Sequence, residues 1–144
     1  MVLDLFSRQL IGWSMRSRID SELAINVLLM AVWRRNPSVP VIVHSDQGCQ
    51  YSSHDWQAFL KAHSLVASMS RRGNCYDNVV DESFSQLLKR ERIRRKTYLD
   101  REEARRDVFN YIEMFYNPNR RHSYANDDSP VEFENQYFNR LRSV

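Results

Sequence analysis

The stretch from Val41 to Tyr51 reads VIVHSDQGCQY, and it places an acidic side chain shortly after an apolar run. The short, fully apolar segment Val39–His44 has the pattern of a strand buried on both faces of a sheet. Asp46 then lies at the end of this strand. A carboxylate held at a strand end can help to bind a hard divalent cation.

Glu82 lies beyond it, with 35 residues in between, and opens a helix predicted from Val79 to about Lys96. At about 100° per residue, Gln86 and Lys89 lie within roughly 40° of Glu82 on the helical wheel, opposite the apolar side chains. Such a helix buries one face and presents a carboxylate, an amide and a cation together. An amphipathic surface helix with solvated charges gives the same wheel, so the wheel alone does not decide between them.

The other predicted elements alternate between strands and helices. Gly12 lies inside the predicted strand Gln9–Met15 and marks a bulge or a close backbone approach. The order indicates a mixed α/β fold in one domain spanning residues 1–144, with a catalytic-core part (1–98) and a C-terminal helical part (99–144). The elements are a hairpin (Val2–Phe6 and Gln9–Met15), helices from Asp20 or Ser21 to Arg35 and from His54 to His63, a strand Leu65–Met69, a loop Ser70–Asn78, a helix from Asp100 to Asn117 with an apolar face of Ala104, Val108, Tyr111, Ile112 and Phe115, and a last helix starting at Ser129-Pro130.

The composition is that of a globular protein, with 42% apolar residues and a net charge of +3. No apolar run approaches the roughly 18 residues that a membrane span needs, and no signal peptide is recognised. The two cysteines, Cys49 and Cys75, fit a reducing cytoplasm better than a disulfide framework. We therefore expect a cytoplasmic protein.

Two basic clusters suggest nucleic acid as a partner. Lys89–Lys96 carries six positive charges against one glutamate, and Asn119–His122 contains Arg120 and Arg121. Clusters of this kind can neutralise phosphates, although a solvated helix face would show the same charges. The loop arginines Arg71 and Arg72 likewise admit two interpretations, DNA contact or plain exposure.

Two other kinds of site are weaker. His44, Ser45 and Asp46 are consecutive, but neighbours on a strand point to alternate faces, which disfavours a serine nucleophile. Cys49 and Cys75 flank the two carboxylates, yet they lack the paired spacing of a zinc site.

Several motifs together resemble the bacterial insertion-sequence transposases of the OrfB type, whose integrase core is related to retroviral integrase. The resemblance is carried by HSDQGCQY, SMSRRGNCYDNVVDESFSQLLK, YIEMFYN-x-x-RRHS and SPVEFEN, while VLDLFSRQLIGWSM is similar to the second and third core strands. It covers essentially the whole chain. It implies a ribonuclease-H-like fold, a mixed sheet flanked by helices, and an Asp-Asp-Glu triad that holds two Mg²⁺ (or Mn²⁺) ions.

Matched to this family, Asp46 corresponds to the second aspartate of the triad and Glu82 to its glutamate. The first aspartate belongs to a central strand upstream of VLDLFSR, and we expect that strand to be missing here. Asp4 matches a different position, and Asp81 is interpreted as a capping or solvated residue. With two of three metal ligands and two unpaired interior strand edges, little or no catalysis is expected from this chain alone.

The resemblance implies DNA, both transposon ends and target, as the partner. It also implies self-association or association with a full-length transposase, and a bacterial, nucleoid-associated location. We expect Lys89, Gln86, Arg71, Arg72, Arg120 and Arg121 to contact DNA. The alternatives are a non-catalytic remnant that binds DNA or full-length transposase and interferes with it, and a ribonuclease-H-like nuclease that hydrolyses without joining.

Overall fold

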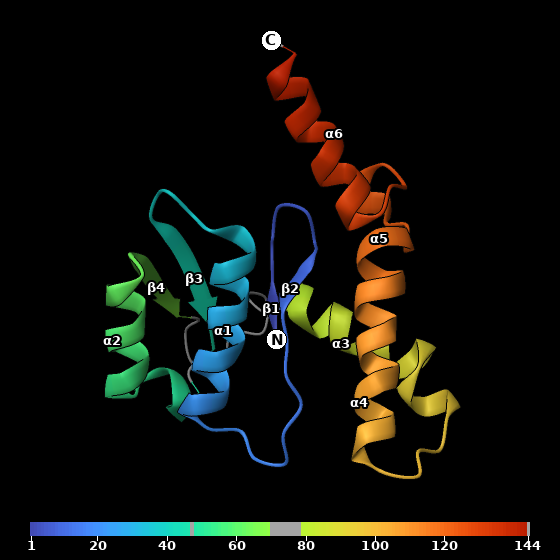
Figure 1. Ribbon diagram of the computed structural model, residues 1–144, viewed down its shortest axis with the longest axis horizontal. Coiled ribbons are helices and arrows are strands. Elements are labelled where there is room, and N and C mark those ends of the chain that lie inside the picture. Colours follow the sequence, from blue (N-terminus) through green and yellow to red (C-terminus); the bar gives the residue numbers. More distant parts are fainter. Residues whose placement is uncertain (47, 70–78, 144) are drawn as a thin grey trace. The chain divides into compact units, whose positions relative to one another are not determined.

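The computed structural model of the chain describes residues 1–46, 48–69 and 79–143. The chain forms two compact units (Figure 1). The first unit comprises Met1–Val2 and Ile11–Glu82, and the second comprises Leu3–Leu10 and Ser83–Val144. The chain therefore passes from one unit to the other within the N-terminal hairpin and again within helix α3. The subdivision predicted at residue 98 stays a prediction.

The helices of the first unit begin where the sequence predicts. Helix α1 (Ser21–Arg35) is capped by Asp20, whose carboxylate accepts a hydrogen bond from the Leu23 amide at 2.9 Å. Helix α2 (His54–Ala62) is capped in the same way by the Ser53 hydroxyl. Side-chain caps of this kind satisfy amides that lack a partner in the first helical turn, which explains why these boundaries are visible in the sequence.

Strands β3 (Val41–Ser45) and β4 (Leu65–Met69) pair in parallel, in register from Val41 opposite Leu65 to Ser45 opposite Met69. The prediction that the strand here is buried on both faces is wrong, because Val41 is 40% and Ile42 70% exposed. Within the described ranges β3 pairs with β4 alone. Neighbouring residues of a strand point to opposite faces, so the exposure of both Val41 and Ile42 means that neither face of β3 is fully covered.

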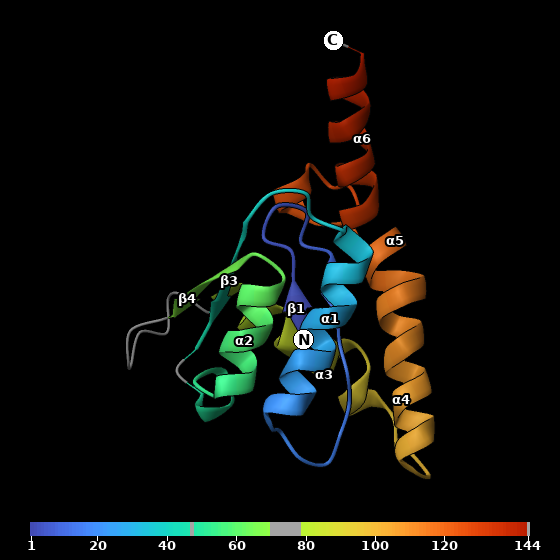
Figure 2. The ribbon, with the colours of Figure 1, turned by 60° about the vertical axis from the view of Figure 1, so that its left-hand side comes forward.

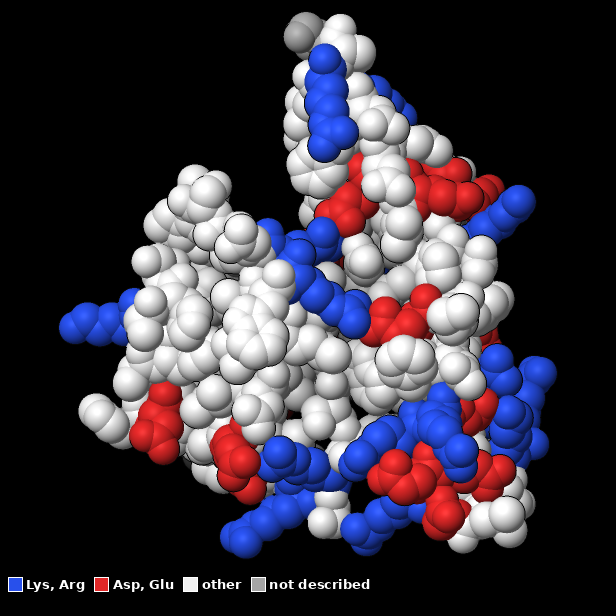
Figure 3. Space-filling model, in the orientation of Figure 1, with Lys and Arg blue, Asp and Glu red and all other residues white. Residues whose placement is uncertain are grey.

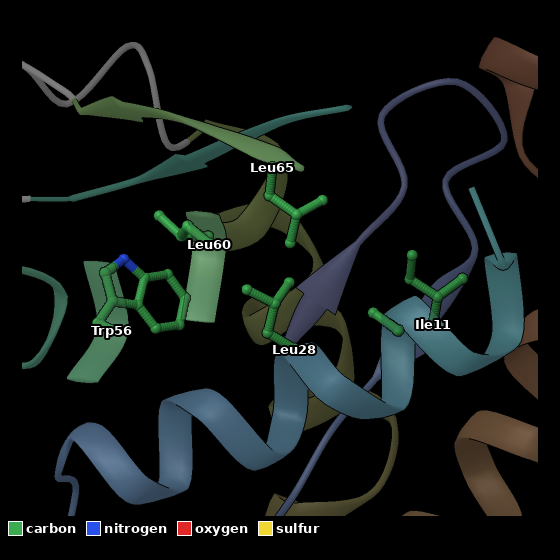
Figure 4. Packing of buried hydrophobic residues seen from close by; sticks show 6 residues of the cluster. Ile11, Leu28, Trp56, Leu60 and Leu65 are labelled. Carbon is green, nitrogen blue, oxygen red and sulfur yellow. The ribbon is translucent and has the colours of Figure 1, made fainter. Parts of the chain in front are cut away.

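The core of the first unit lies between its helices and strands (Figure 4). Apolar side chains from β2, α1, α2 and β4 meet there: Ile11, Leu28, Ala31, Trp56, Leu60 and Leu65. None of them is more than 9% exposed. Their burial holds β4, and through it β3, against α2, so the end of β3 has a fixed place in this unit.

The N-terminal hairpin is shorter than predicted. Strand β1 (Val2–Leu3) pairs with β2 (Leu10–Gly12), and the residues between them form a wide turn. The Asp4 carboxylate accepts a hydrogen bond from the Phe6 amide at 2.8 Å, and Arg8 adopts a φ of 61°. Side chain-to-backbone bonds of this kind compete with strand pairing, which explains the loss of strand at both sides of the turn.

Gly12 marks a close backbone approach, one of the two roles that the sequence left open. A Cβ atom added at this position would lie 2.3 Å from the carbonyl oxygen of Val27 in α1. The missing side chain is therefore what lets β2 lie directly against α1.

We expect Gly12→Ala to lower the free energy of unfolding by about 2 kcal/mol, because the backbone of α1 must shift to admit the methyl group. Chemical denaturation followed by circular dichroism measures the change. Gly48→Ala is the matched control, since its Cβ would meet only the flexible Gln50 side chain, at 2.7 Å. Equal losses in the two variants would contradict the assignment.

Helix α3 (Val79–Glu91) ends earlier than predicted, and a 3₁₀ turn, η3 (Ile93–Arg95), follows it. The break lies at Arg92, whose φ of −128° and ψ of −65° are not helical. The sequence there contains no glycine or proline that would have marked the end of the helix.

The next helical segment changes its backbone hydrogen-bonding pattern along its length. Helix α4 (Arg101–Phe109) continues into a π-helical segment, η4 (Asn110–Tyr116), and then into α5 (Asn117–Asn119). On a regular helix Tyr116 would lie about 140° from Tyr111, whereas π-type bonding turns it to the same side. Tyr116 is thus 2% exposed, while Phe115, predicted on the apolar face, is 40% exposed.

The last helix, α6 (Pro130–Arg142), begins at the predicted Ser-Pro pair. Ser129 and Glu132 form a reciprocal capping box at its start. Within the second unit α6 extends beyond α5 (Figures 1 and 2). Among the described residues we find no helix that combines the length and the apolar character of a membrane span.

Candidate active site

Asp46 lies where the sequence places it, immediately after β3. Its carboxylate accepts a hydrogen bond from the amide of Gly48 at 2.9 Å, which fixes the side chain in a local turn. The 3₁₀ turn η1 (Cys49–Tyr51) follows, and the Tyr51 ring packs edge-on against the core residue Trp56 at a centroid distance of 5.0 Å. The Asp46 turn is therefore anchored to the core of the first unit.

Glu82 lies in the first turn of α3, and its side chain is exposed. Gln86 and Lys89 on the same helix are also exposed, whereas Phe84 is 2% exposed. The amphipathic wheel is confirmed, with Phe84 buried, the other apolar residues of that side half-buried and the Glu82 side exposed. The roles of Gln86 and Lys89 toward DNA stay predictions.

The two predicted carboxylates act on a common neighbour, Asp81. Partial burial raises the pKa of the Asp81 carboxyl, and the negative charges of Asp46 and Glu82 raise it further. Burial also raises the pKa of Tyr51, with smaller contributions from Asp46 and Asp81 in the same direction. Asp46 and Glu82 thus both act electrostatically on Asp81.

Asp81, interpreted from the sequence as a capping or solvated residue, is exposed and lies in the first turn of α3. Its only signal in the sequence is its position directly before Glu82, which does not distinguish the two interpretations. The amino group of Met1 also lies near Asp81, and its charge acts to lower the pKa of that carboxyl. Burial in turn lowers the pKa of the Met1 amino group.

The donors at this site fit a hard divalent ion in kind. Carboxylate oxygens suit Mg²⁺, which is commonly held by one or two carboxylates together with water and substrate phosphates. Within residues 1–46, 48–69 and 79–143, however, no group of three or more His, Cys, Asp or Glu side chains is arranged to hold a metal ion. Among the described residues the candidate site therefore consists of carboxylate oxygens without a three-residue metal cluster.

The two weaker interpretations gain no support. The Nδ1 atom of the His44 ring lies 3.1 Å from the hydroxyl of Ser68, the residue opposite His44 on β4. Cys49 is exposed, and Cys75 lies outside the described residues.

The predicted arginines divide into three cases. Arg71 and Arg72 lie outside the described residues. The Arg120 guanidinium bonds to the Glu91 carboxylate at 2.7 Å, so it holds the second unit together, and its contact with DNA stays a prediction. Arg121 is exposed.

Known protein families match both parts of the chain that carry the candidate carboxylates. A family model described as "Integrase core domain" matches residues 1–75, and a second model of the same description matches residues 82–142. Both candidate carboxylates fall inside these matches, Asp46 in the first and Glu82 at the start of the second.

Curated relatives are transposases. The chain is 52% identical over 136 residues to "Transposase InsF for insertion sequence IS3fB" of Escherichia coli (strain K12), with 94% of this chain and 47% of the relative covered. It is 44% identical over 132 residues to "Transposase for insertion sequence element IS904" of Lactococcus lactis subsp. lactis (strain IL1403), with 92% and 52% covered. The chain thus spans about half the length of the curated relatives it matches.

The fold is similar to that of a solved retroviral assembly. A chain of the "simian T-cell lymphotropic virus intasome in complex with PP2A regulatory subunit B56 gamma" superposes with a TM-score of 0.72 at 16% identity. The match covers 91% of this chain and 45% of the other. The predicted ribonuclease-H-like integrase architecture is thereby confirmed at the level of fold.

Proposed function

The chain belongs to the integrase core family of insertion-sequence transposases, and from this membership we propose that it contributes Asp46 and Glu82 to a DNA strand-transfer site. The observation that supports the proposal best is the position of the two carboxylates, with Asp46 directly after β3 and Glu82 in the first turn of α3, both in the first unit. Each carboxylate is exposed, and each is held by a regular element of the first unit, a strand end and a helix start.

Asp46 and Glu82 would hold a divalent ion, Mg²⁺ or Mn²⁺. Such an ion, when bound, stabilises the charge that develops on the phosphate during cleavage and joining of DNA strands. The Gly48 amide keeps the Asp46 carboxylate oriented, and the open side of α3 places Gln86 and Lys89 along the same helix face as Glu82. A lysine at this position suits a phosphate of the DNA backbone.

We expect low activity from this chain alone. Two of its residues match the three carboxylates of the family triad, so a divalent ion would bind weakly and keep most of its water. A second candidate function is therefore non-catalytic: association with DNA or with a full-length transposase. Association is favoured because, among the described residues, β3 pairs with β4 on one edge only, and a free strand edge can pair with another chain.

A metal-binding measurement tests the site directly. We expect Asp46→Asn and Glu82→Gln each to weaken Mn²⁺ binding to the chain at least about tenfold, because loss of a direct ligand costs no less than loss of a residue that supports one. Electron paramagnetic resonance of free Mn²⁺ gives the affinity. Asp55→Asn and Glu22→Gln are the matched controls, since both residues are exposed acids in the first turns of other helices of the same unit. Equal weakening in the controls would overturn the assignment.

Strand transfer on a labelled duplex with Mn²⁺ tests the expected level of activity. The chain alone should give no joined product above background. A joined product that disappears with Glu82→Gln would show that two matching carboxylates suffice. Cleavage without joining would instead favour the nuclease alternative.

A further inference from the structure

The basic segment Lys89–Lys96 is divided by the structure into cations with an internal partner and cations without one. Lys96 donates to the Asp107 carboxylate at 2.7 Å, and Arg92 lies 3.7 Å from the same oxygen. The other Asp107 oxygen accepts a hydrogen bond from the Tyr98 hydroxyl at 2.7 Å. The Asp107 side chain is only 11% exposed, so this cluster is an internal fastening within the second unit.

This fastening fixes the turn η3 against α4. Arg92 precedes the turn and Lys96 follows it, and both are held by Asp107 in the last turn of α4. Two anchors on either side of a three-residue turn leave it little freedom to move. Groups on such a turn lose less conformational entropy when they bind a ligand than the same groups on a flexible tail.

Arg94 and Arg95, within the turn, have no such internal partner among the described residues. Both side chains are exposed, and in the described parts of the chain neither has an ion pair. Asp107 is already occupied by Arg92 and Lys96. The charges of Arg94 and Arg95 therefore face the solvent and are not paired with any carboxylate that the structure describes.

The acidic residues at the start of α4 do not supply the missing partners. Glu102 pairs with Arg105 at 3.3 Å, Glu103 accepts a hydrogen bond from the Leu99 amide at 2.7 Å, and Asp100 caps the helix. Figure 3 shows this part of the surface, where basic side chains gather with acidic ones between them. It lies over the α3–α4 connection, at the lower right of Figure 1.

We propose that Arg94 and Arg95 bind phosphates of the double-stranded DNA backbone, as a contact additional to the site of Asp46 and Glu82. The inference rests on the proposed function for the identity of the polymer. Guanidinium groups bind phosphate oxygens through paired hydrogen bonds, and two of them on one fixed turn can each contact a phosphate. The turn carries one apolar side chain, Ile93 at 38% exposure, which gives little surface for a lipid bilayer. The contact reads no bases and is sequence-independent.

Fluorescence anisotropy of a labelled duplex with the full chain, titrated over a range of salt concentrations, tests the contact. We expect Arg94→Gln/Arg95→Gln to weaken binding roughly tenfold or more at about 0.1 M salt and to reduce the salt slope by about 2, since each phosphate contact contributes about 0.9. Arg140→Gln/Arg142→Gln, at the exposed end of α6, removes the same charge from the same unit and should change binding less than about twofold. Arg94→Lys/Arg95→Lys should keep most of the salt slope.

The outcomes separate this contact from the proposed function. If the unmodified chain binds DNA and Arg94→Gln/Arg95→Gln binds equally well, the contact is refuted and the proposed function is untouched. Equal weakening in the α6 variant would show a general charge effect and also refute it. If the unmodified chain binds no DNA at low salt, both the contact and the DNA-binding part of the proposed function fail. Circular dichroism melting of each variant confirms that the fold is retained.

Discussion

Replacing Asn117 by alanine is expected to lower the free energy of unfolding of the second unit by about 2–4 kcal/mol. The Asn117 side chain is 3% exposed and bonds to both backbone groups of Leu10, which is fully buried. Its amide donates to the Leu10 carbonyl at 2.9 Å, and its oxygen accepts from the Leu10 N–H at 2.9 Å. Alanine leaves both groups buried without a partner, at a cost of about 1–3 kcal/mol for each.

Asn119→Ala is the matched control for this experiment. Asn119 lies two residues further along, is exposed, and donates one hydrogen bond to the Met114 carbonyl at 2.8 Å. We expect this variant to lose less than about 1 kcal/mol, because water replaces an exposed bond. Urea denaturation followed by tyrosine fluorescence compares the two variants. Similar midpoints for both would show that the bonds to Leu10 contribute little.

The elements that the sequence predicts best are the helices whose first residue is marked by a capping side chain. Asp20, Ser53, Asp100 and Ser129 each cap a helix through a hydrogen bond to an amide three residues ahead. Such a cap depends only on neighbouring residues, so it can be recognised before the fold is known.

The elements that the sequence predicts poorly depend on distant partners. The apolar run of β3 indicates a strand buried on both faces, yet its burial depends on which elements pack against those faces. The π-helical segment gives no local signal, because the apolar positions from α4 to α5 also fit a regular helix. Only the placement of Tyr116 inside and Phe115 outside reveals the change of period.

The candidate site shows the same division. Asp46 and Glu82 were predicted from a strand end, a helix start and the surrounding motifs, and their elements lie as expected. The surrounding charges could not be sorted in this way. The sequence does not distinguish Arg92, Arg94 and Arg95. In the structure Arg92 pairs with Asp107, whereas Arg94 and Arg95 are exposed to solvent.

Arg120 also has an internal carboxylate partner, Glu91, and we expect the loss of that partner to have a large effect on stability. Its guanidinium bonds to the Glu91 carboxylate at 2.7 and 3.2 Å, and the same carboxylate accepts a hydrogen bond from the Tyr111 hydroxyl at 2.6 Å. Tyr111 is 1% exposed, and burial, with help from Glu91, raises the pKa of its phenol. Glu91 therefore joins α3 to the π-helical segment and to the chain that follows α5.

We expect Glu91→Ala to lower the free energy of unfolding of the second unit by about 3 kcal/mol, because it leaves a buried hydroxyl and a half-buried cation without their acceptor. The value is at the low end for a broken buried pair, since the Glu91 and Arg120 side chains are 24% and 21% exposed. Glu102→Ala removes an exposed ion-pair partner of Arg105 and should cost less than about 1 kcal/mol. Urea denaturation measures both, and equal costs would contradict the buried network.

The same network predicts a dependence on pH. The hydrogen bond from Arg120 lowers the pKa of the Glu91 carboxyl in the folded chain. A group with a lowered folded-state pKa stabilises the fold fully above its unfolded pKa, about 4.3 for glutamate, and loses that contribution as pH falls through the folded value. The difference in stability between the unmodified chain and Glu91→Gln should therefore be constant near neutral pH and shrink below about pH 4.3. A difference that grows toward acid pH would contradict this, because Glu91 would then be more easily protonated in the folded chain than in the unfolded one.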